Sequence, residues 1–67
     1  MALSARNQLT GTVKSIVLGT VMAEVVVDVD GHDVVSVITR RSVESMGIRA
    51  GDTVTAVIKA TEVLLEK

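Results

Sequence analysis

The stretch MAEVVVDVDGHDVVSVI, from Met22 to Ile38, decides the fold, because it holds two runs rich in β-branched residues around one turn signal. The dipeptide Asp30-Gly31 is typical of tight β-hairpin turns, since both residue types tolerate the positive φ that such turns need. We therefore expect two antiparallel strands here, residues 22–28 and 32–38.

The register of this hairpin can be argued from charge. A two-residue loop would place Asp28 opposite Asp33, and like charges directly opposite each other destabilise a sheet. A three-residue loop, Val29-Asp30-Gly31 with the glycine in the left-handed conformation, instead pairs Asp28 with His32. It also matches apolar partners: Val25 with Val35, Ala23 with Val37 and Val26 with Val34. We therefore predict the three-residue loop.

Strand patterns continue on both sides of the hairpin. A first strand is expected over residues 7–17, and Gly11 inside it suggests a bulge or a place where another backbone comes close. One face of this strand would carry Leu9, Gly11, Val13, Ser15 and Val17. Gly19-Thr20 reads as the turn that follows. Two further strands are expected at residues 53–59 and 63–65.

A short helix interrupts the strands after residue 39. Val43 and Met46 lie three residues apart, Thr39 suits the N-cap, and Gly47 suits the left-handed position after a helix. Residues 49–52 then form a turn. The resulting order is three strands, one helix and two strands. It predicts an all-β fold, a five-stranded OB-like Greek-key barrel with one short helix between the third and fourth strands.

Length and composition point to self-association. The chain has 67 residues, with no Phe, Tyr, Trp, Cys or Pro, although 48% of it is hydrophobic and no linker divides it. We read residues 1–67 as a single domain. A chain this short buries only about 60% of its unfolded surface. Without rings, disulfides or a metal, such a scaffold usually needs a partner surface, so we expect a homo-oligomer.

The same composition excludes several classes. The net charge is −1 and aromatic side chains are missing, which argues against nucleic-acid binding. No apolar run spans a membrane, and the first six residues lack the apolar core of a signal peptide, so we expect a cytoplasmic protein away from membranes. A single His and no Cys leave no metal-cation site, and the lone His32 has no obvious nucleophile or acid partner, so we expect no enzyme.

Cations with hydroxyl neighbours recur where expected strands or the helix begin or end. The clusters are Ser4-Ala5-Arg6, Thr39-Arg40-Arg41-Ser42 and Lys59-Ala60-Thr61. Free backbone N–H groups occur at such boundaries, and the start of a helix favours an anion. Guanidinium, ammonium, hydroxyl and amide donors without a nearby carboxylate suit a tetrahedral oxyanion, although each cluster alone also fits solvated charge and capping.

The opening segment Ser4-Ala5-Arg6-Asn7-Gln8-Leu9, with Gly11 and Val13, resembles the molbindins. These are small molybdenum-pterin-binding (Mop) proteins whose fold also occurs as the TOBE domain of molybdate transporters and regulators. The similarity continues through Gly19, Val21, Ala23-Glu24-Val25, Ile38-Thr39, Ser42, Met46-Gly47-Ile48, Gly51, Ala56, Ile58-Lys59-Ala60 and Val63. It therefore covers essentially the whole chain.

This resemblance implies a function in molybdenum storage or homeostasis inside the cell. The family's barrels assemble as hexamers built from dimers and bind molybdate or tungstate at subunit interfaces, with no cofactor and no catalysis. The matching pocket positions are Ser4, Ala5, Arg6, Thr39, Ser42, Lys59 and Ala60. Arg6 and Lys59 would supply positive charge. The serines and Thr39 would supply hydroxyl donors, and the two alanines would supply main-chain N–H groups. A possible second oxyanion site would involve Gly19, Thr20 and Val21.

Two other functions remain open from the sequence. An OB-like barrel could bind single-stranded nucleic acid, although the missing aromatic residues and the acidic balance argue against it. A purely structural oligomer without a ligand is the other alternative. Its thermal stability would not respond to oxyanions, whereas that of a molybdate-binding protein would.

Overall fold

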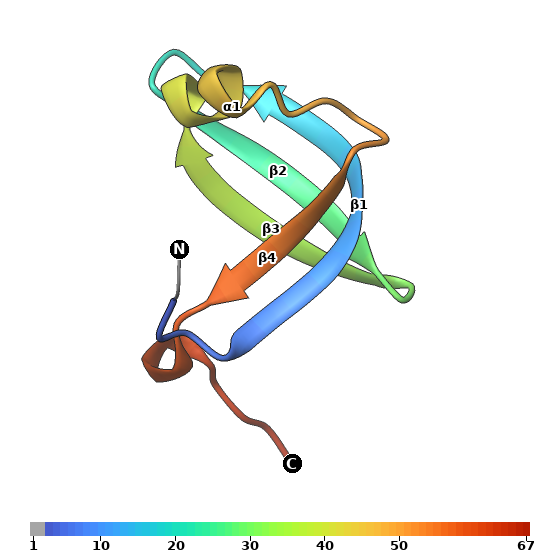
Figure 1. Cartoon of the computed structure of the whole chain (residues 1–67), viewed down its shortest axis with the longest axis vertical. Helices are drawn as coiled ribbons and strands as arrows, with labels where there is room; N and C mark the ends of the chain where they lie inside the picture. The colour runs from blue at the N-terminus through green and yellow to red at the C-terminus, as the bar shows by residue number, and fades with distance from the viewer. Residues whose placement is uncertain (1–2) are drawn as a thin grey trace.

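A computed structural model of the chain describes residues 3–67 and contains one curved antiparallel sheet (Figure 1). Its strands are β1 (Asn7–Leu18), β2 (Met22–Val29), β3 (His32–Thr39) and β4 (Thr53–Ile58). They lie in the order β3-β2-β1-β4. A short helix α1 (Arg40–Met46) follows β3, and a 3-10 turn η1 (Ala60–Glu62) follows β4.

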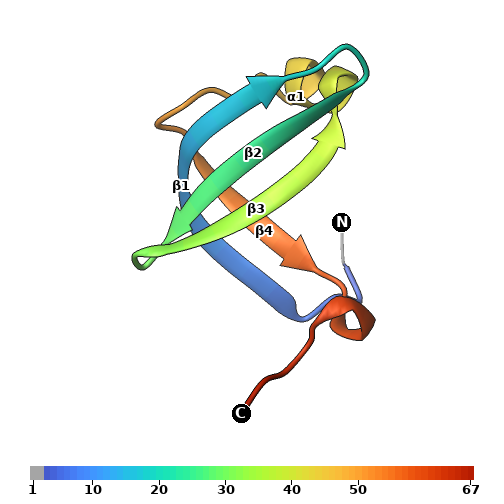
Figure 2. The same ribbon diagram turned by 180° about the vertical axis from the view of Figure 1, so that it is seen from behind.

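The long strand β1 gives the sheet its curvature. Its first half pairs with β4, from Asn7 opposite Ile58 to Thr12 opposite Thr53, while its second half pairs with β2. The strand bends between these halves, and the sheet curls into the expected OB-like form (Figures 1 and 2). Helix α1 lies at one end of the curl, and η1 lies at the other end beside the N-terminal segment.

The core is small and consists of short side chains. Its buried members are Val13, Ala23, Val25, Val27 and Val43. Three of them alternate along β2, as expected for a strand with one face inside. Val43 is the buried residue of α1, so the helix covers the end of the curl. The partly buried side chains around this core are Ile16, Val29, Val34, Ile38, Ile48 and Val54.

The predicted three-residue hairpin loop is wrong. Strands β2 and β3 pair with Asp28 opposite Asp33 and Val29 opposite His32, so the loop is the two-residue Asp30-Gly31. Both loop residues have positive φ, 50° and 83°, as a type I′ turn requires. The predicted apolar pairs shift with the register. In the structure Val25 faces Ser36, Val26 faces Val35, Val27 faces Val34 and Ala23 faces Ile38.

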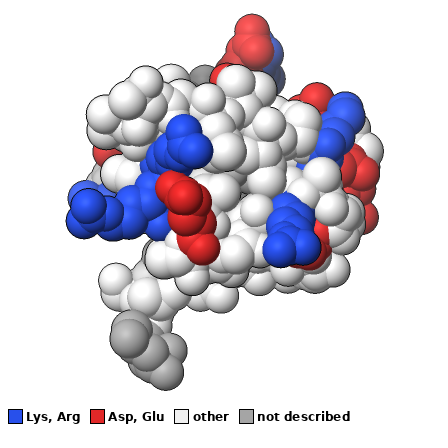
Figure 3. Space-filling view, turned by 90° about the horizontal axis from the view of Figure 1, so that it is seen from above, with Lys and Arg blue, Asp and Glu red and all other residues white. Residues whose placement is uncertain are grey.

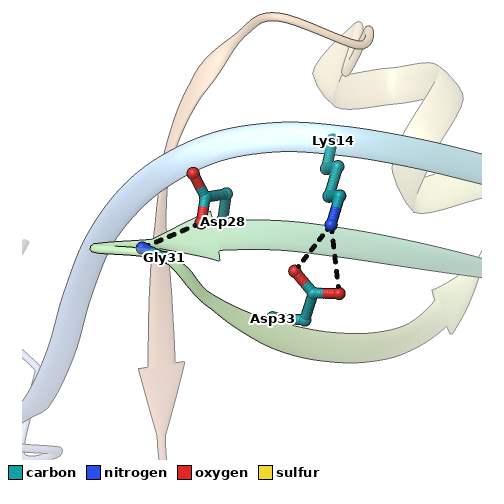
Figure 4. Close-up of polar contacts among 4 residues, drawn as sticks. All are labelled: Lys14, Asp28, Gly31 and Asp33. Carbon is teal, nitrogen blue, oxygen red and sulfur yellow. Dashed lines mark hydrogen bonds and ion pairs between the residues drawn. The ribbon is translucent and has the colours of Figure 1, made fainter.

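The two facing carboxylates are compensated separately (Figure 4). Asp28 Oδ1 accepts a hydrogen bond of 3.0 Å from the N–H of Gly31 within the turn. Asp33 receives the Lys14 ammonium, whose Nζ lies 3.0 and 3.3 Å from the two carboxylate oxygens. Lys14 belongs to β1, beyond β2. A counter-charge from a third strand therefore permits a register that pairwise repulsion disfavours.

A bulge in β1 changes which side chains face inward. The pairing with β2 shifts between Val13 and Ser15, so Lys14 has no partner in the ladder. Val13 is buried and Ile16 is half-buried, whereas Val17 is 63% exposed. The expected simple alternation of β1 was therefore wrong beyond Val13, because one extra residue reverses the inward and outward positions.

Gly11 was predicted to mark either a bulge or a close approach of another backbone. It marks a close approach, and the bulge lies between Val13 and Ser15 instead. A Cβ atom built on Gly11 would collide with the carbonyl oxygen of Asp28. It would also lie 2.8 Å from the side chain of Val29 and 2.9 Å from that of Val27. Only glycine lets β1 cross β2 this closely.

The predicted helix is confirmed with both of its caps. Thr39 is the N-cap, and its side chain accepts a hydrogen bond from the N–H of Ser42. Gly47 adopts the left-handed conformation with φ 63°, and its N–H donates to the Glu44 carbonyl over 3.1 Å. Neither α1 nor any other helix within residues 3–67 has the length and apolarity to cross a membrane.

The fifth strand predicted at residues 63–65 does not form. After Ile58 the chain makes the η1 turn, in which the N–H of Glu62 donates to the Lys59 carbonyl over 2.9 Å, and then leaves the sheet. Within residues 3–67 no strand lies beside this segment, so its backbone groups have no ladder partner there. Leu64 and Leu65 are 92% and 95% exposed. The described fold thus has four strands.

Candidate functional site

The pairing of β1 with β4 brings two parts of the predicted site together. Asn7 lies opposite Ile58, which places the preceding Arg6 close to the following Lys59. An open hollow of about 460 Å³ forms here, and we call it the terminal hollow. It is lined by Ser4, Ala5, Arg6, Lys59, Ala60 and Thr61. The structure thus brings together five of the seven predicted pocket residues.

The chemistry of the terminal hollow suits an anion. Its lining offers two cations and two hydroxyl groups, and it contains no carboxylate. Within the described chain, neither Arg6 nor Lys59 makes an ion pair, since the two pairs found are Lys14–Asp33 and Arg40–Glu44. The main chain of the lining is held locally, because the Ala5 carbonyl accepts a hydrogen bond of 2.9 Å from Gln8 Nε2. Both charges are therefore free to neutralise a ligand.

The two remaining pocket residues, Thr39 and Ser42, lie at the α1 end. The Oγ atoms of the two residues are 2.7 Å apart, and Thr39 Oγ1 also accepts from the Ser42 N–H over 3.1 Å. One hydroxyl of this pair donates to the other, whichever direction the bond takes. The pair therefore keeps one O–H that can donate outward.

A second open hollow, of about 450 Å³, lies beside Thr39, and we call it the helix hollow. Its lining comprises Thr20, Val21, Thr39, Arg40, Arg41 and Glu44. Figure 3 looks onto this end of the molecule, where acidic and basic side chains are scattered over a mostly uncharged surface. Three of the six lining side chains are charged, two of them positively.

Arg40 joins the β1–β2 turn to the helix. Its N–H donates to the Val21 carbonyl over 2.8 Å, and its Nη1 donates to the Gly19 carbonyl over 3.4 Å. Its Nε lies 3.3 Å from a carboxylate oxygen of Glu44. The residues predicted for a second site, Gly19, Thr20 and Val21, are thus at the same end as Thr39 and next to it.

The two hollows lie far apart in one chain. Helix α1 is near one end of the longest axis, whereas η1 and the N-terminal segment are near the other (Figure 1). That axis extends over 35 Å. Donor atoms must come within about 3 Å of an oxyanion's oxygens to bind it. A single chain therefore cannot bring Thr39 and Ser42 to an ion that Arg6 and Lys59 hold.

The predicted pocket residues are also open to solvent in the single chain. Ala5 and Ser42 are half-buried, and Ser4, Arg6, Thr39, Lys59 and Ala60 are exposed. In residues 3–67 no cluster of three His, Cys, Asp or Glu side chains could hold a metal cation. The donors present are suited to an anion, and in the single chain most of them lie open to solvent.

Sequence reasoning left three lining residues of the helix hollow unassigned. Arg40 and Arg41 belonged to a recognised cation cluster, but the resemblance gave them no role. Glu44 was given no role, although its spacing of four residues from Arg40 on the predicted helix was a signal that could have found this pair. Thr61 of the terminal hollow was likewise noted with its neighbours but given no role.

Comparison with known proteins gives a consistent result. The family model described as the TOBE domain matches residues 3–65. Molybdenum-pterin-binding protein 3 of Clostridium pasteurianum is 47% identical over 66 residues, which cover 97% of each chain. The solved molybdate-binding protein of Sporomusa ovata is 49% identical, with a TM-score of 0.96 and full coverage of both chains.

A further solved structure was determined with molybdate bound. It is that of the cytoplasmic molybdate-binding protein ModG, which is 46% identical with a TM-score of 0.84. The similarity covers 90% of the present chain and 43% of the ModG chain. The same fold thus occurs within a longer protein whose ligand is a tetrahedral oxyanion.

Proposed function

Since the chain belongs to the TOBE-domain family of molybdenum-pterin-binding proteins, we propose that it binds molybdate and tungstate in pockets shared between subunits. The pocket would combine the terminal hollow of one chain with Thr39 and Ser42 of another. We further propose that it buffers or stores these ions in the cytoplasm as a single-domain subunit without catalytic activity, nucleic-acid partner or membrane contact.

One observation carries this proposal: the terminal hollow presents two unpaired cations and no carboxylate. Molybdate is a dianion at neutral pH, and burying it without counter-charges would cost many kcal/mol. Arg6 and Lys59 together match its charge. Hydrogen bonds to a charged group contribute roughly 1.5–3 kcal/mol each, so the surrounding hydroxyl and amide donors add to the affinity.

The need for a second chain follows from the distance between the hollows. Five proposed ligand residues lie at one end of the molecule and two at the other. A second copy that docks its α1 end against the terminal hollow would add the free O–H of the Thr39–Ser42 pair and cover the exposed cations. The family resemblance suggests that such contacts continue into a hexamer. Binding and assembly would then support each other.

Calorimetric titration tests the proposal directly. We expect molybdate and tungstate to bind far more tightly than sulfate, which has the same charge and shape but is smaller. The mass of the protein in solution, measured in the same samples, should correspond to an oligomer. Elemental analysis of the protein as purified should find molybdenum or tungsten.

Three outcomes would contradict the proposal. Equal millimolar affinity for molybdate and sulfate would mean that the terminal hollow is not selective. Tight molybdate binding by a monomer would show that one chain suffices, and the shared pocket would be wrong. Retention of single-stranded DNA on a filter at low salt would favour the nucleic-acid alternative instead.

A further inference from the structure

Arg41 is one of three charged residues that line the helix hollow, none of which belongs to the proposed pocket. It lines this hollow together with Thr39, whose hydroxyl belongs to the proposed pocket. In the part of the chain that the structure describes, Arg41 makes no ion pair and its side chain donates no hydrogen bond. It therefore lies next to a proposed ligand residue with its charge uncompensated.

The neighbouring Arg40 differs in this respect. Its Nε lies 3.3 Å from Glu44, and its Nη1 is directed to the Gly19 carbonyl at 3.4 Å. Glu44 offsets part of its charge, and the two contacts link its side chain to the helix and to the β1–β2 turn. Arg40 is thus a structural link between helix and turn, whereas Arg41 contributes a net positive field at Thr39.

Resting on the proposed function, we propose that Arg41 is a specificity-determining residue that makes the shared pocket prefer doubly charged oxyanions over singly charged ones. Arg6 and Lys59 already balance a dianion. When the helix hollow of one chain docks against the terminal hollow of another, Arg41 adds a third cation. The pocket then carries an excess of positive charge, which a dianion neutralises better than a monoanion.

The size of the effect follows from Coulomb's law. The attraction between a fixed cation and a bound anion is proportional to the anion's charge, so it is twice as large for a dianion. For a partly solvated cation several ångströms away, removal of the charge should weaken molybdate binding about three- to tenfold. The loss for a monoanion should be about the square root of that factor.

Perrhenate is the matched probe, because it is tetrahedral and close to molybdate in size but carries one negative charge. Molybdate and perrhenate are titrated at low salt into the wild-type oligomer, R41Q and R41K. R49Q serves as the control, since Arg49 is an exposed cation in the loop after α1 and lines neither hollow. The mass of each variant is measured alongside.

We expect R41Q to lose more affinity for molybdate than for perrhenate, so that its selectivity for molybdate falls about two- to threefold, while R41K and R49Q keep the wild-type ratio. The difference between R41Q and wild type should shrink as salt is added. If R41Q still binds molybdate and its ratio of molybdate to perrhenate affinity is unchanged, the role assigned to Arg41 is overturned while the proposed function stands. If R41Q fails to assemble, loss of selectivity in R41K would likewise overturn a role based on charge.

The failure of the proposed function is a separate outcome. A wild-type protein that does not bind molybdate would overturn the proposed function, and the role of Arg41 would fall with it. A wild-type protein that binds molybdate and perrhenate equally would leave molybdate binding in place but remove the charge preference assigned to Arg41.

Discussion

Arg6 is the residue on which the proposed pocket depends most, because it supplies a permanent charge and several N–H donors. Arg6→Ala should weaken molybdate binding by more than about 2 kcal/mol, since the anion then lacks one of its two counter-charges. The fold should survive, because Arg6 is exposed. Calorimetry and a thermal melt of the same variant measure both effects.

The control for this prediction is Arg49→Ala, which removes an arginine from outside both hollows. It should leave the affinity for molybdate unchanged. An Arg6→Ala protein with wild-type affinity would mean that the pocket has been assigned to the wrong residues.

Gly11 makes a prediction about stability. Gly11→Ala should destabilise the fold by about 1–3 kcal/mol or more, because the new methyl group meets the backbone of Asp28, which cannot move aside as a side chain could. Gly47→Ala is the comparison, since it adds a methyl group in open space at φ 63° and should cost about 1–2 kcal/mol. Denaturant unfolding of both variants shows which one loses more stability. A smaller loss for Gly11→Ala than for Gly47→Ala would contradict the close approach of the two backbones at Gly11.

At the scale of elements, the helix was predicted correctly and the hairpin register was not. Helix α1 was predicted with both caps, because Thr39 and Gly47 act on their immediate neighbours. The hairpin register was wrong, because the cation that compensates Asp33 comes from β1, which pairwise reasoning about β2 and β3 does not include. Charge repulsion between two strands is a weak guide when a third strand can supply the counter-ion.

The remaining errors have the same origin. The bulge at Lys14 depends on how β1 bends to pair with two strands, and no residue of β1 predicts its position. The terminal run Val63-Leu64-Leu65 has the composition of a strand, but a strand needs a neighbour with free backbone groups. The described chain offers none beside it. The candidate site was predicted as one set of residues at a subunit interface, and the sequence does not show which of them lie at which end of the chain; that division comes from the fold.

The Lys14–Asp33 pair provides a test of the hairpin. Both side chains are half exposed, at 58% and 50%, so solvent screening limits the coupling to about 0.2–1 kcal/mol. A double-mutant cycle with Lys14→Met and Asp33→Asn measures this coupling. It should fall as salt is raised. Asp33→Asn alone should also relieve its repulsion with Asp28, so its net effect on stability should be small.

At the scale of the whole molecule, apolar surface exceeds what the core can bury. Among residues 3–67, five short side chains make up the buried core. More than half of the surface of several larger apolar side chains is exposed. They are Leu3, Val17, Val21, Val35, Val37, Met46, Leu64 and Leu65. An isolated domain with this balance would be marginal, so contact between copies is the expected source of its stability.

The corresponding prediction concerns thermal unfolding. The Tm should rise with protein concentration, as expected when assembly contributes to stability. Molybdate should raise the Tm further, because a ligand at a hundred times its Kd stabilises the folded state by about 2.7 kcal/mol. Sulfate at the same concentration should not raise the Tm. Differential scanning calorimetry over a range of protein concentrations gives both results. A Tm that changes neither with protein concentration nor with added molybdate would favour a stable monomer that does not bind this ligand.

The placement of the two hollows at opposite ends of the chain has a genetic consequence. If every pocket takes one half from each of two subunits, a chain damaged only at Arg6 still carries a sound Thr39–Ser42 half. A chain damaged only at Ser42 still carries a sound terminal half. Two variants that each bind molybdate poorly would then complement each other when they are co-expressed, because some pockets in the mixed oligomers would combine two intact halves.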